Sequence, residues 1–275
     1  MLLLCDSGSS KTDWIVFDEE RKIKVATFST CGFNPAVMGV GAVEKRLYTE
    51  LLPKLDGITV SNVNFYGAGC TPEISPILED ILYKMFPNAT DILVASDLLE
   101  AAKAMCNNQE GIVGILGTGS NSCLFDGNEI IAHTPALGYI LGDEGSGAVL
   151  GRIFVNALLK GLLPEKITSD FFKETNLTQA SIIEKVYCGD SPNRFLASMS
   201  PFIHRHRNEE TIKDIVINNF RGFFTHNISR YNRPNLPVNC VGSIAYHYSD
   251  ELITAAEKEG FIIGKIKKSP IENLI

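Results

Sequence analysis

Two short turns rich in glycine and hydroxyl residues carry the groups best suited to bind phosphate. They occupy residues 5–12 (CDSGSSKT) and 116–121 (LGTGSN), and each follows an apolar run typical of a buried strand. Such turns can point several backbone N–H groups at one anion, and Lys11 adds positive charge to the first. Alone, either turn is equally well explained as an ordinary hairpin, since glycine and serine are common turn residues.

The second turn repeats the surroundings of the first. In both places an apolar run leads into the turn, and the run after the turn ends in Phe-Asp, at Phe17-Asp18 and at Phe125-Asp126. An internal repeat predicts two similar lobes, whose turns would clamp a polyphosphate from opposite sides. Neither turn fits a Walker P-loop or a Rossmann dinucleotide site, because both lead into a second strand where those motifs lead into a helix.

Asp97 is the carboxylate placed best to act on a substrate. It directly follows the apolar run 92–96 (ILVAS) and precedes an apolar helix that begins at Leu98. This puts it at the carboxyl end of a strand, where open α/β sheets bind their ligands. A kinase needs one carboxylate to accept the proton of the attacking hydroxyl. Asp97 also suits a helix N-cap, and the two roles are compatible.

Three further polar segments could contact a ligand. Residues 142–146 (GDEGS) precede a predicted helix, so their carboxylates lie at the positive end of its dipole, either as caps or as ligands for a sugar or a metal-bound water. Asn34 could offer its amide to hydroxyl groups. Gly242-Ser243 ends a buried strand and could let the backbone approach a flat ligand, although glycine after a strand is also an ordinary turn.

Strands and helices that alternate along the chain position these groups. Periodicity predicts strands at 63–67 and 92–96 and helices at 41–52 and 72–85. The segments predicted after the second turn are a helix at 146–160, mostly helical structure over 167–224 and a strand at 238–241. This alternation is typical of an α/β fold.

The repeat and the alternation together predict two similar α/β lobes. We expect an N-terminal lobe over residues 1–108 and a C-terminal lobe over 109–275, enlarged by a helical insert, with the option that its last residues return to the first lobe. No Pro-rich or Gly/Ser-rich linker divides them, so close packing around a hinge near 106–110 and an active-site cleft between the lobes are expected.

The composition argues against several classes of protein. The 275 residues are 45% hydrophobic, and the net charge is −7 without a block of basic residues, which disfavours nucleic acid as a partner. The 7 cysteines form no CxxC pair and the 5 histidines no HExxH, so a metal or iron–sulfur site is not expected. The sequence shows neither a signal peptide nor an apolar run of membrane-spanning length, and a cytoplasmic location away from membranes is expected.

Taken in order, the motifs resemble the N-acetylglucosamine kinase-like family, in the BadF/BadG-type ATPase branch of the sugar kinase, actin and Hsp70 superfamily. The resemblance covers nearly the whole chain. The motifs that carry it are DSGSSKTD (6–13), FN (33–34), SD (96–97), GTGSN (117–121), GDEGS (142–146) and VGSI (241–244). It implies an actin-like ATPase fold of two ribonuclease H-like lobes. It also implies an ATP-dependent kinase that phosphorylates the 6-hydroxyl of an amino sugar, most of all N-acetylglucosamine, with Mg²⁺.

The resemblance also implies roles for individual residues. Asp97 would be the catalytic base and contact the sugar, and Asp6 would hold Mg²⁺ through water. The residues implied for ATP are Asp6, Gly8, Ser9, Ser10, Lys11, Thr12, Gly117, Thr118 and Gly119 around the phosphates, with Gly242 and Ser243 in the adenosine pocket. The further residues implied for the sugar are Asn34, Ser120, Asn121, Gly138 and Asp143.

The sequence departs from the family pattern in two places. Ser10 stands where threonine is usual, which keeps the hydroxyl, and residues 136–138 (ALG) stand where the family often has Gly-Trp-Gly beside the sugar. The second change removes an aromatic ring from the implied sugar pocket. N-acetylglucosamine, N-acetylmuramic acid and glucosamine therefore stay open as substrates.

Two other functions stay open beside the kinase. An activator ATPase of the same superfamily shares an iron–sulfur cluster across a dimer; Cys106 and Cys123 flank the relevant region but form no cluster motif. The second alternative is a sugar or nucleotide sensor that binds its ligand without turnover. Related repressors carry a DNA-binding domain, and we expect no room for such a domain before a strand that begins at residue 2. A homodimer is also left open.

Overall fold

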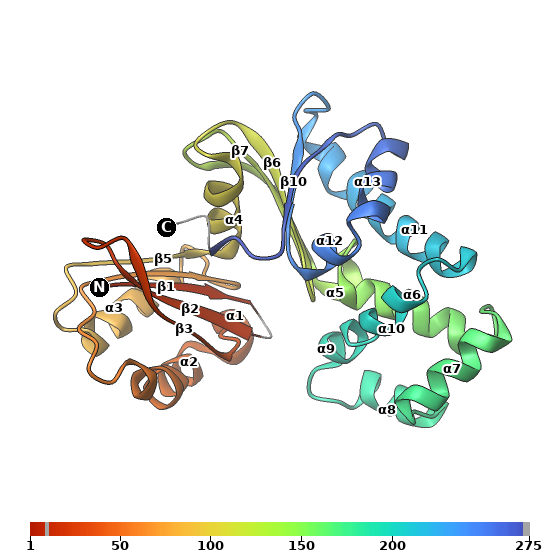
Figure 1. Cartoon of the computed structure of the whole chain (residues 1–275), viewed down its shortest axis with the longest axis horizontal. Coiled ribbons are helices and arrows are strands. Elements are labelled where there is room, and N and C mark those ends of the chain that lie inside the picture. The colour runs from red at the N-terminus through yellow and green to blue at the C-terminus, as the bar shows by residue number, and fades with distance from the viewer. Residues whose placement is uncertain (9–10, 272–275) are drawn as a thin grey trace. The chain divides into compact units, whose positions relative to one another are not determined.

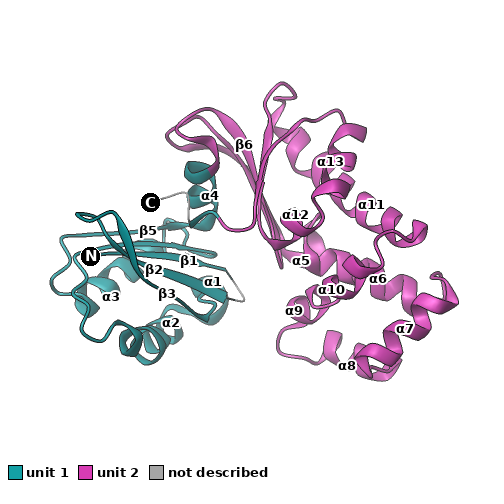
Figure 2. Ribbon diagram, viewed as in Figure 1, with its two compact units in different colours: residues 1–104, 270–275 teal, residues 105–269 magenta. Residues whose placement is uncertain are grey.

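The computed structural model describes residues 1–8 and 11–271, and the chain forms two compact units (Figure 1, Figure 2). Unit 1 comprises Met1–Ala104 and Pro270–Ile275, and unit 2 comprises Met105–Ser269. Each unit is built around one five-stranded sheet. Ser9 and Ser10, which were predicted to contact ATP, lie outside the described residues.

The sheet of unit 1 has the strand order β3-β2-β1-β4-β5. Its first three strands pair antiparallel and β1, β4 and β5 pair parallel. The strands are β1 (Leu2–Ser7), β2 (Lys11–Asp18), β3 (Ile23–Cys31), β4 (Asn62–Gly67) and β5 (Asp91–Ser96). The central strand β1 is almost continuously buried, as expected for a strand covered on both faces, whereas the edge strand β3 alternates between exposed and partly exposed residues.

Short helices complete unit 1. They are α1 (Pro35–Met38), α2 (Val40–Arg46), a π-helical turn (Leu47–Leu51), a 3₁₀ turn (Leu52–Leu55), α3 (Ser75–Met85) and α4 (Asp97–Cys106), the last of which runs into unit 2. The helix predicted at 41–52 therefore begins as α2 and changes geometry toward Pro53, whose missing N–H cannot continue an α-helix. Trp14 anchors the core, with Phe33 at 6.2 Å and Phe65 at 6.0 Å between ring centroids.

The sheet of unit 2 repeats that of unit 1, with the order β10-β9-β6-β7-β8. Its strands are β6 (Gly111–Leu116), β7 (Ser120–Phe125), β8 (Ile130–Thr134), β9 (Val238–Val241) and β10 (Ile263–Lys267). Strands β6, β7 and β8 form the antiparallel part, and β9 and β10 add in parallel. The predicted internal repeat and the two-lobed α/β fold are confirmed.

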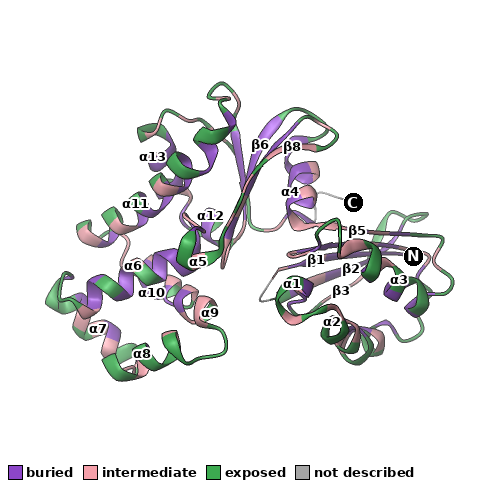
Figure 3. Ribbon diagram, turned by 180° about the vertical axis from the view of Figure 1, so that it is seen from behind, coloured by how far each residue is buried: buried purple, intermediate pink, exposed green. Residues whose placement is uncertain are grey.

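Among its described residues, unit 2 contains nine complete α-helices and the end of a tenth. They are α5 (Gly138–Leu141), α6 (Gly147–Leu159), α7 (Glu165–Thr175), α8 (Gln179–Tyr187), α9 (Pro192–Ala197), α10 (Ser200–Arg205), α11 (Glu210–His226), α12 (Ser243–His247) and α13 (Ser249–Lys258), together with the end of α4. Among the described helices of unit 2, α6 and α11 bury the most residues (Figure 3). No helix among the described residues is long and apolar enough to cross a membrane.

Candidate active site

Asp97 is the first residue of helix α4 and directly follows strand β5, so a strand fixes its backbone on one side and a helix on the other. Ser96 caps the helix, because its Oγ accepts the backbone N–H of Leu99 at 3.2 Å. The capping role considered for Asp97 thus belongs to Ser96. Asp97 lies at the carboxyl end of a parallel strand, where open α/β sheets bind their ligands.

The environment of Asp97 makes its carboxylate more basic than usual. Burial raises the pKa of Asp97 to about 6, and the negative charge of Asp6 adds to the increase, while backbone N–H groups of Leu98 and of Asp97 itself act against it. At neutral pH a carboxyl with this pKa is still mostly ionised, yet accepts a proton more readily than a solvated aspartate. These are the properties that a general base needs.

A third carboxyl group, Glu100, lies one helical turn after Asp97 on α4. Its side chain is fully buried, and neither carboxyl oxygen has a hydrogen-bond partner within the described part of the chain. Burial raises the pKa of Glu100 well above its usual value, and the charges of Asp6 and Asp97 raise it further. The sequence analysis missed Glu100, although an acidic residue three positions after Asp97 in an apolar helix was a visible signal.

The first glycine-rich turn is closed from inside the sheet. The Gly8 N–H donates to the Lys11 carbonyl at 2.9 Å, and the Lys11 ammonium pairs with Asp13 at 2.7 Å. Thr12 is buried, and its Oγ1 lies 2.7 Å from the Ser7 hydroxyl and donates to the Cys31 carbonyl at 3.1 Å. The Thr12 hydroxyl is thus engaged within unit 1, where it fixes the base of the turn.

Asn34 is attached to the same network. The Ser7 hydroxyl donates to the Phe33 carbonyl at 3.0 Å and accepts the Phe33 N–H at 3.1 Å, which ties the loop to β1. Asn34 then caps α1, with its Oδ1 accepting the N–H of Ala36 at 3.1 Å. Unit 1 therefore links the first turn, Asn34 and strand β1 through one pair of buried hydroxyl groups.

The second glycine-rich turn is closed by a helix. The Gly117 N–H donates to the Gly119 carbonyl at 3.0 Å, and the first two N–H groups of α6, those of Gly147 and Ala148, donate to the carbonyls of Gly117 and Thr118 at 2.8 and 3.1 Å. Two of the four N–H groups that a helix start usually leaves unpaired are thereby satisfied by the turn. These hydrogen bonds fix the position of the turn relative to the start of α6.

Asp143 is held beside this turn in an uncommon backbone conformation, with a φ of 55°. A Cβ atom on Gly119 would lie 3.0 Å from its Oδ2. Burial raises the pKa of Asp143 to about 6, the backbone N–H of Ser120 lowers it, and the charge of Glu144 raises it. The structure thus brings Gly119, which was predicted to bind the ATP phosphates, close to Ser120 and Asp143, which were predicted to contact the sugar.

The GDEGS segment is anchored by residues from helix α11 and from the segment that follows it. His226 Nδ1 lies 3.1 Å from Glu144 Oε1, and Asn227 Nδ2 donates to Glu144 Oε2 at 3.3 Å. The buried Asn219 accepts the Gly145 N–H at 3.1 Å and donates to the Ser146 carbonyl at 3.2 Å. The sequence analysis missed this support, since it joins residues more than seventy positions apart.

Two further residues were predicted to contact the sugar. Asn121 lies on strand β7, and Gly138 lies shortly before the GDEGS segment. Asn121 is partly exposed, and its Oδ1 accepts the Ser122 N–H at 3.0 Å and faces His133 Nε2 at 2.8 Å. Gly138 begins α5 with a φ of 73°. It follows Leu137, which is 64% exposed and also has a positive φ, of 63°.

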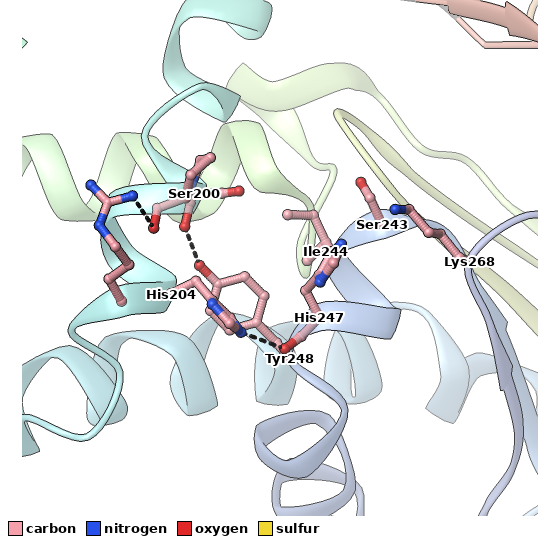
Figure 4. A pocket seen from close by; sticks show the side chains of 9 residues that line it. Ser200, His204, Ser243, Ile244, His247, Tyr248 and Lys268 are labelled. Carbon is pink, nitrogen blue, oxygen red and sulfur yellow. Dashed lines mark hydrogen bonds between the residues drawn. The ribbon is translucent and has the colours of Figure 1, made fainter.

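Gly242 and Ser243 join strand β9 to helix α12. Gly242 has a φ of 116°, and a Cβ atom there would lie 2.3 Å from the Leu116 carbonyl oxygen, so this close approach to the end of β6 requires glycine. Ser243 lines a pocket of about 480 Å³ that belongs to unit 2 (Figure 4). Its other lining residues include Ser200, His204, His247, Tyr248 and Lys268.

The pocket walls are held by hydrogen bonds between its own residues. Tyr248 OH donates to the Ser200 carbonyl at 2.6 Å, and His204 Nε2 lies 3.0 Å from the His247 carbonyl (Figure 4). The rings of His204 and Tyr248 meet edge to face with centroids 5.2 Å apart. The pocket thus combines flat rings with the polar Ser243 and Lys268.

The two cysteines considered for a cluster are buried thiols. Burial raises the pKa of Cys123 to about 12 and also raises that of Cys106, whose sulfur receives a long hydrogen bond of 3.9 Å from Asn239 Nδ2. Thiolate is the form that binds metals. Burial therefore favours the protonated thiol at both positions.

The chain is similar to proteins of known structure. No family model matches the chain, and no curated protein matches it. Solved structures do match: the crystal structure of a putative N-acetylglucosamine kinase from Porphyromonas gingivalis is 47% identical, covers 100% of this chain and 97% of that chain, and has a TM-score of 0.96. A protein of the same description from Chromobacterium violaceum is 15% identical over 99% of this chain and 96% of that chain, with a TM-score of 0.76.

More distant structures share the fold. A ROK family glucokinase from Streptomyces griseus, solved with glucose and AMPPNP, is 14% identical, covers 97% of this chain and 93% of that chain, and has a TM-score of 0.53. Two similar five-stranded mixed sheets together with these neighbours define an actin-like ATPase fold. The full-length match at 47% identity is closer still. The chain belongs to the N-acetylglucosamine kinase-like family.

Proposed function

We propose that the protein transfers the γ-phosphoryl group of ATP to the 6-hydroxyl of an amino sugar, with N-acetylglucosamine as the first candidate. The observation that carries this proposal is Asp97, a carboxylate with a pKa of about 6 at the carboxyl end of β5. The Porphyromonas gingivalis relative is described as a putative N-acetylglucosamine kinase, which supports an amino sugar as the substrate.

In the proposed reaction, Asp97 accepts the proton of the sugar hydroxyl as the oxygen attacks phosphorus. Phosphoryl transfer otherwise depends on positioning and on charge stabilisation. Asn34, Ser120, Asn121, Gly138 and Asp143 are proposed to orient the sugar. Asp143 and Asn34 are both held by backbone hydrogen bonds, which supports a role in orientation because a fixed side chain loses little freedom on binding.

ATP is proposed to bind both glycine-rich turns with its phosphates, through Gly8 and Lys11 in unit 1 and Gly117, Thr118 and Gly119 in unit 2. Its adenosine is proposed to occupy the pocket beside Ser243. A volume of about 480 Å³ lies within the range of small-molecule sites, and the flat rings of His204 and Tyr248 suit a planar base.

Mg²⁺ is expected with ATP, and the available donors fit it. Mg²⁺ prefers carboxylate oxygens, waters and phosphates over a closed protein cage, and the described residues contain no group of three or more His, Cys, Asp or Glu arranged to hold a metal. Asp6 is the carboxylate proposed to hold the ion through water. When bound, the ion would neutralise charge that develops on the phosphates.

A panel assay with matched variants tests the proposal. ADP release should be measured over N-acetylglucosamine, N-acetylmuramic acid, glucosamine and glucose. Asp97→Asn should lower kcat by about 100-fold to 10 000-fold with sugar and ATP binding retained, since it removes only the proton acceptor. Asp91→Asn, an exposed residue at the other end of β5, should leave kcat unchanged. An active Asp97→Asn enzyme would contradict the assignment of the base.

A further inference from the structure

His133 and Asn121 are neighbours across two strands of unit 2. In the antiparallel pair β7 and β8, His133 lies opposite Cys123, so Asn121, two residues before Cys123, is its diagonal neighbour on the same face of the sheet. The ring nitrogen Nε2 of His133 lies 2.8 Å from Asn121 Oδ1. This contact has no part in the proposed reaction as described above.

The contact determines the orientation of the Asn121 side-chain amide. The backbone N–H of Ser122 lies 3.0 Å from the same Asn121 atom, and a backbone N–H can only donate. The shared atom is therefore the amide oxygen, and His133 Nε2 must carry a proton to donate to it. Partial burial lowers the pKa of His133, which favours a neutral ring at pH 7 with its single proton on Nε2.

Two donors thus occupy both lone pairs of Asn121 Oδ1. The hydrogen bonds of the described residues give Asn121 Nδ2 no acceptor, and Asn121 is partly exposed. Its two remaining N–H groups are the only polar atoms that the side chain can offer to a ligand. A group that binds there has to be an acceptor, such as a hydroxyl oxygen or an acyl carbonyl, because an ammonium group has no lone pair to offer.

We propose that His133 is a positioning residue that holds Asn121 with its amide N–H groups directed to an acceptor oxygen of the sugar. The proposal rests on the proposed function in one respect, namely that Asn121 contacts the sugar. Without His133, one lone pair of Oδ1 is unpaired and the amide can rotate to present its oxygen instead. Sugar binding should weaken, while ATP binding in unit 2 at Ser243 should not.

A kinetic comparison of three proteins tests this role. His133→Ala should raise the KM for the phosphorylated sugar about threefold to tenfold, the worth of one hydrogen bond, with the KM for ATP unchanged and kcat changed by less than about twofold. His133→Gln should restore the wild-type KM, since the Gln amide N–H can take the place of Nε2–H. An unchanged sugar KM in His133→Ala, or an equal rise in both KM values, would overturn the proposal.

A second measurement does not depend on kinase activity. In ¹⁵N-labelled wild-type protein, NMR should show the His133 ring proton on Nε2, protected from exchange by its hydrogen bond, and Asn121→Ala should abolish that protection. A proton on Nδ1, or protection that survives Asn121→Ala, would refute the arrangement. If no sugar is phosphorylated, the proposed function fails, and the NMR result with calorimetric titration of N-acetylglucosamine into wild type and His133→Ala still decides the role of His133.

Discussion

Units 1 and 2 share a sheet but close their glycine-rich turns in different ways. In unit 1, side-chain hydroxyls of Ser7 and Thr12 close the turn from within the sheet. In unit 2, the backbone of α6 closes it, with Asp143 packed against Gly119. A duplicated sheet therefore keeps its strand order while the hydrogen bonds at the turns diverge, because a different element pairs with each turn.

The carboxyl groups of the two units also differ in their surroundings. Asp97 shares unit 1 with Asp6, whose charge adds to the effect of burial on the pKa of Asp97. It also shares the unit with Glu100, whose carboxyl oxygens have no hydrogen-bond partner among the described residues. Asp143 in unit 2 is stabilised by a backbone N–H, and Glu144 beside it is paired with His226. Although burial opposes it, the hydrogen bond from His226 lowers the pKa of Glu144. In unit 1 a second carboxylate raises the pKa of Asp97, whereas in unit 2 Glu144 is hydrogen-bonded to His226 and Asn227.

The largest expected effect concerns the glycines near the two turns. Gly242→Ala should destabilise the protein by about 2–4 kcal/mol, since its φ is 116° and the new Cβ would clash with the Leu116 carbonyl. Gly8→Ala, where the nearest atom would lie 3.5 Å away, should cost less than about 1 kcal/mol. Urea unfolding of both variants measures the difference. Equal losses would show that the turns are constrained alike.

The pH dependence of the reaction separates the two carboxylates of pKa about 6. In the proposed mechanism Asp97 has to be ionised, so kcat/KM should fall about tenfold per pH unit below pH 6, where this carboxylate is protonated. Asp143→Asn should raise the sugar KM and keep the acidic limb, because Asp97 is unchanged. A limb that disappears in Asp143→Asn would assign the titration to unit 2 instead, and initial rates from pH 5 to 8 make the comparison.

The smallest expected effect concerns Glu100 and stability. Its pKa is raised in the folded state, so the unfolded chain loses this proton at lower pH than the folded protein does. The stabilisation by Glu100 is fully present below pH 4.5 and is lost as the pH rises through the folded pKa. Glu100→Gln should therefore stabilise the protein by about 1 kcal/mol at pH 8 and change little at pH 4. Thermal unfolding at both pH values checks this, and equal shifts at both would contradict a titration of Glu100.

Local patterns in the sequence were enough to predict the fold. The apolar runs 63–67, 92–96 and 238–241 lie within β4, β5 and β9, and the matched surroundings of the two turns predicted the repeated sheet. Strand β10 was not among the predicted elements, and its short sequence (IGKIK) carries two lysines. It is an edge strand whose alternation is weak, because its two partly exposed isoleucines are separated by two exposed residues.

The site was predictable where it depends on neighbours in sequence, and not where it depends on packing. Asp97 at a strand end is a local feature, and so is the GDEGS segment before α6. The pairing of Glu144 with His226 spans 82 positions, and the burial of Glu100 depends on how α4 packs. The positive φ of Leu137 had no signal at all, because leucine seldom adopts that conformation.

The hydrogen bonds from Gly147 and Ala148 to the second turn also bear on how the molecule opens. Local unfolding releases contiguous cooperative segments, each with its own free energy. The turn at Gly117 and Thr118 is bonded to the first residues of α6, a helix buried on most of its length. We expect the turn to belong to the same cooperative segment as that helix and to exchange its amide hydrogens as slowly as the core, which would be unusual for a loop that is proposed to contact ATP.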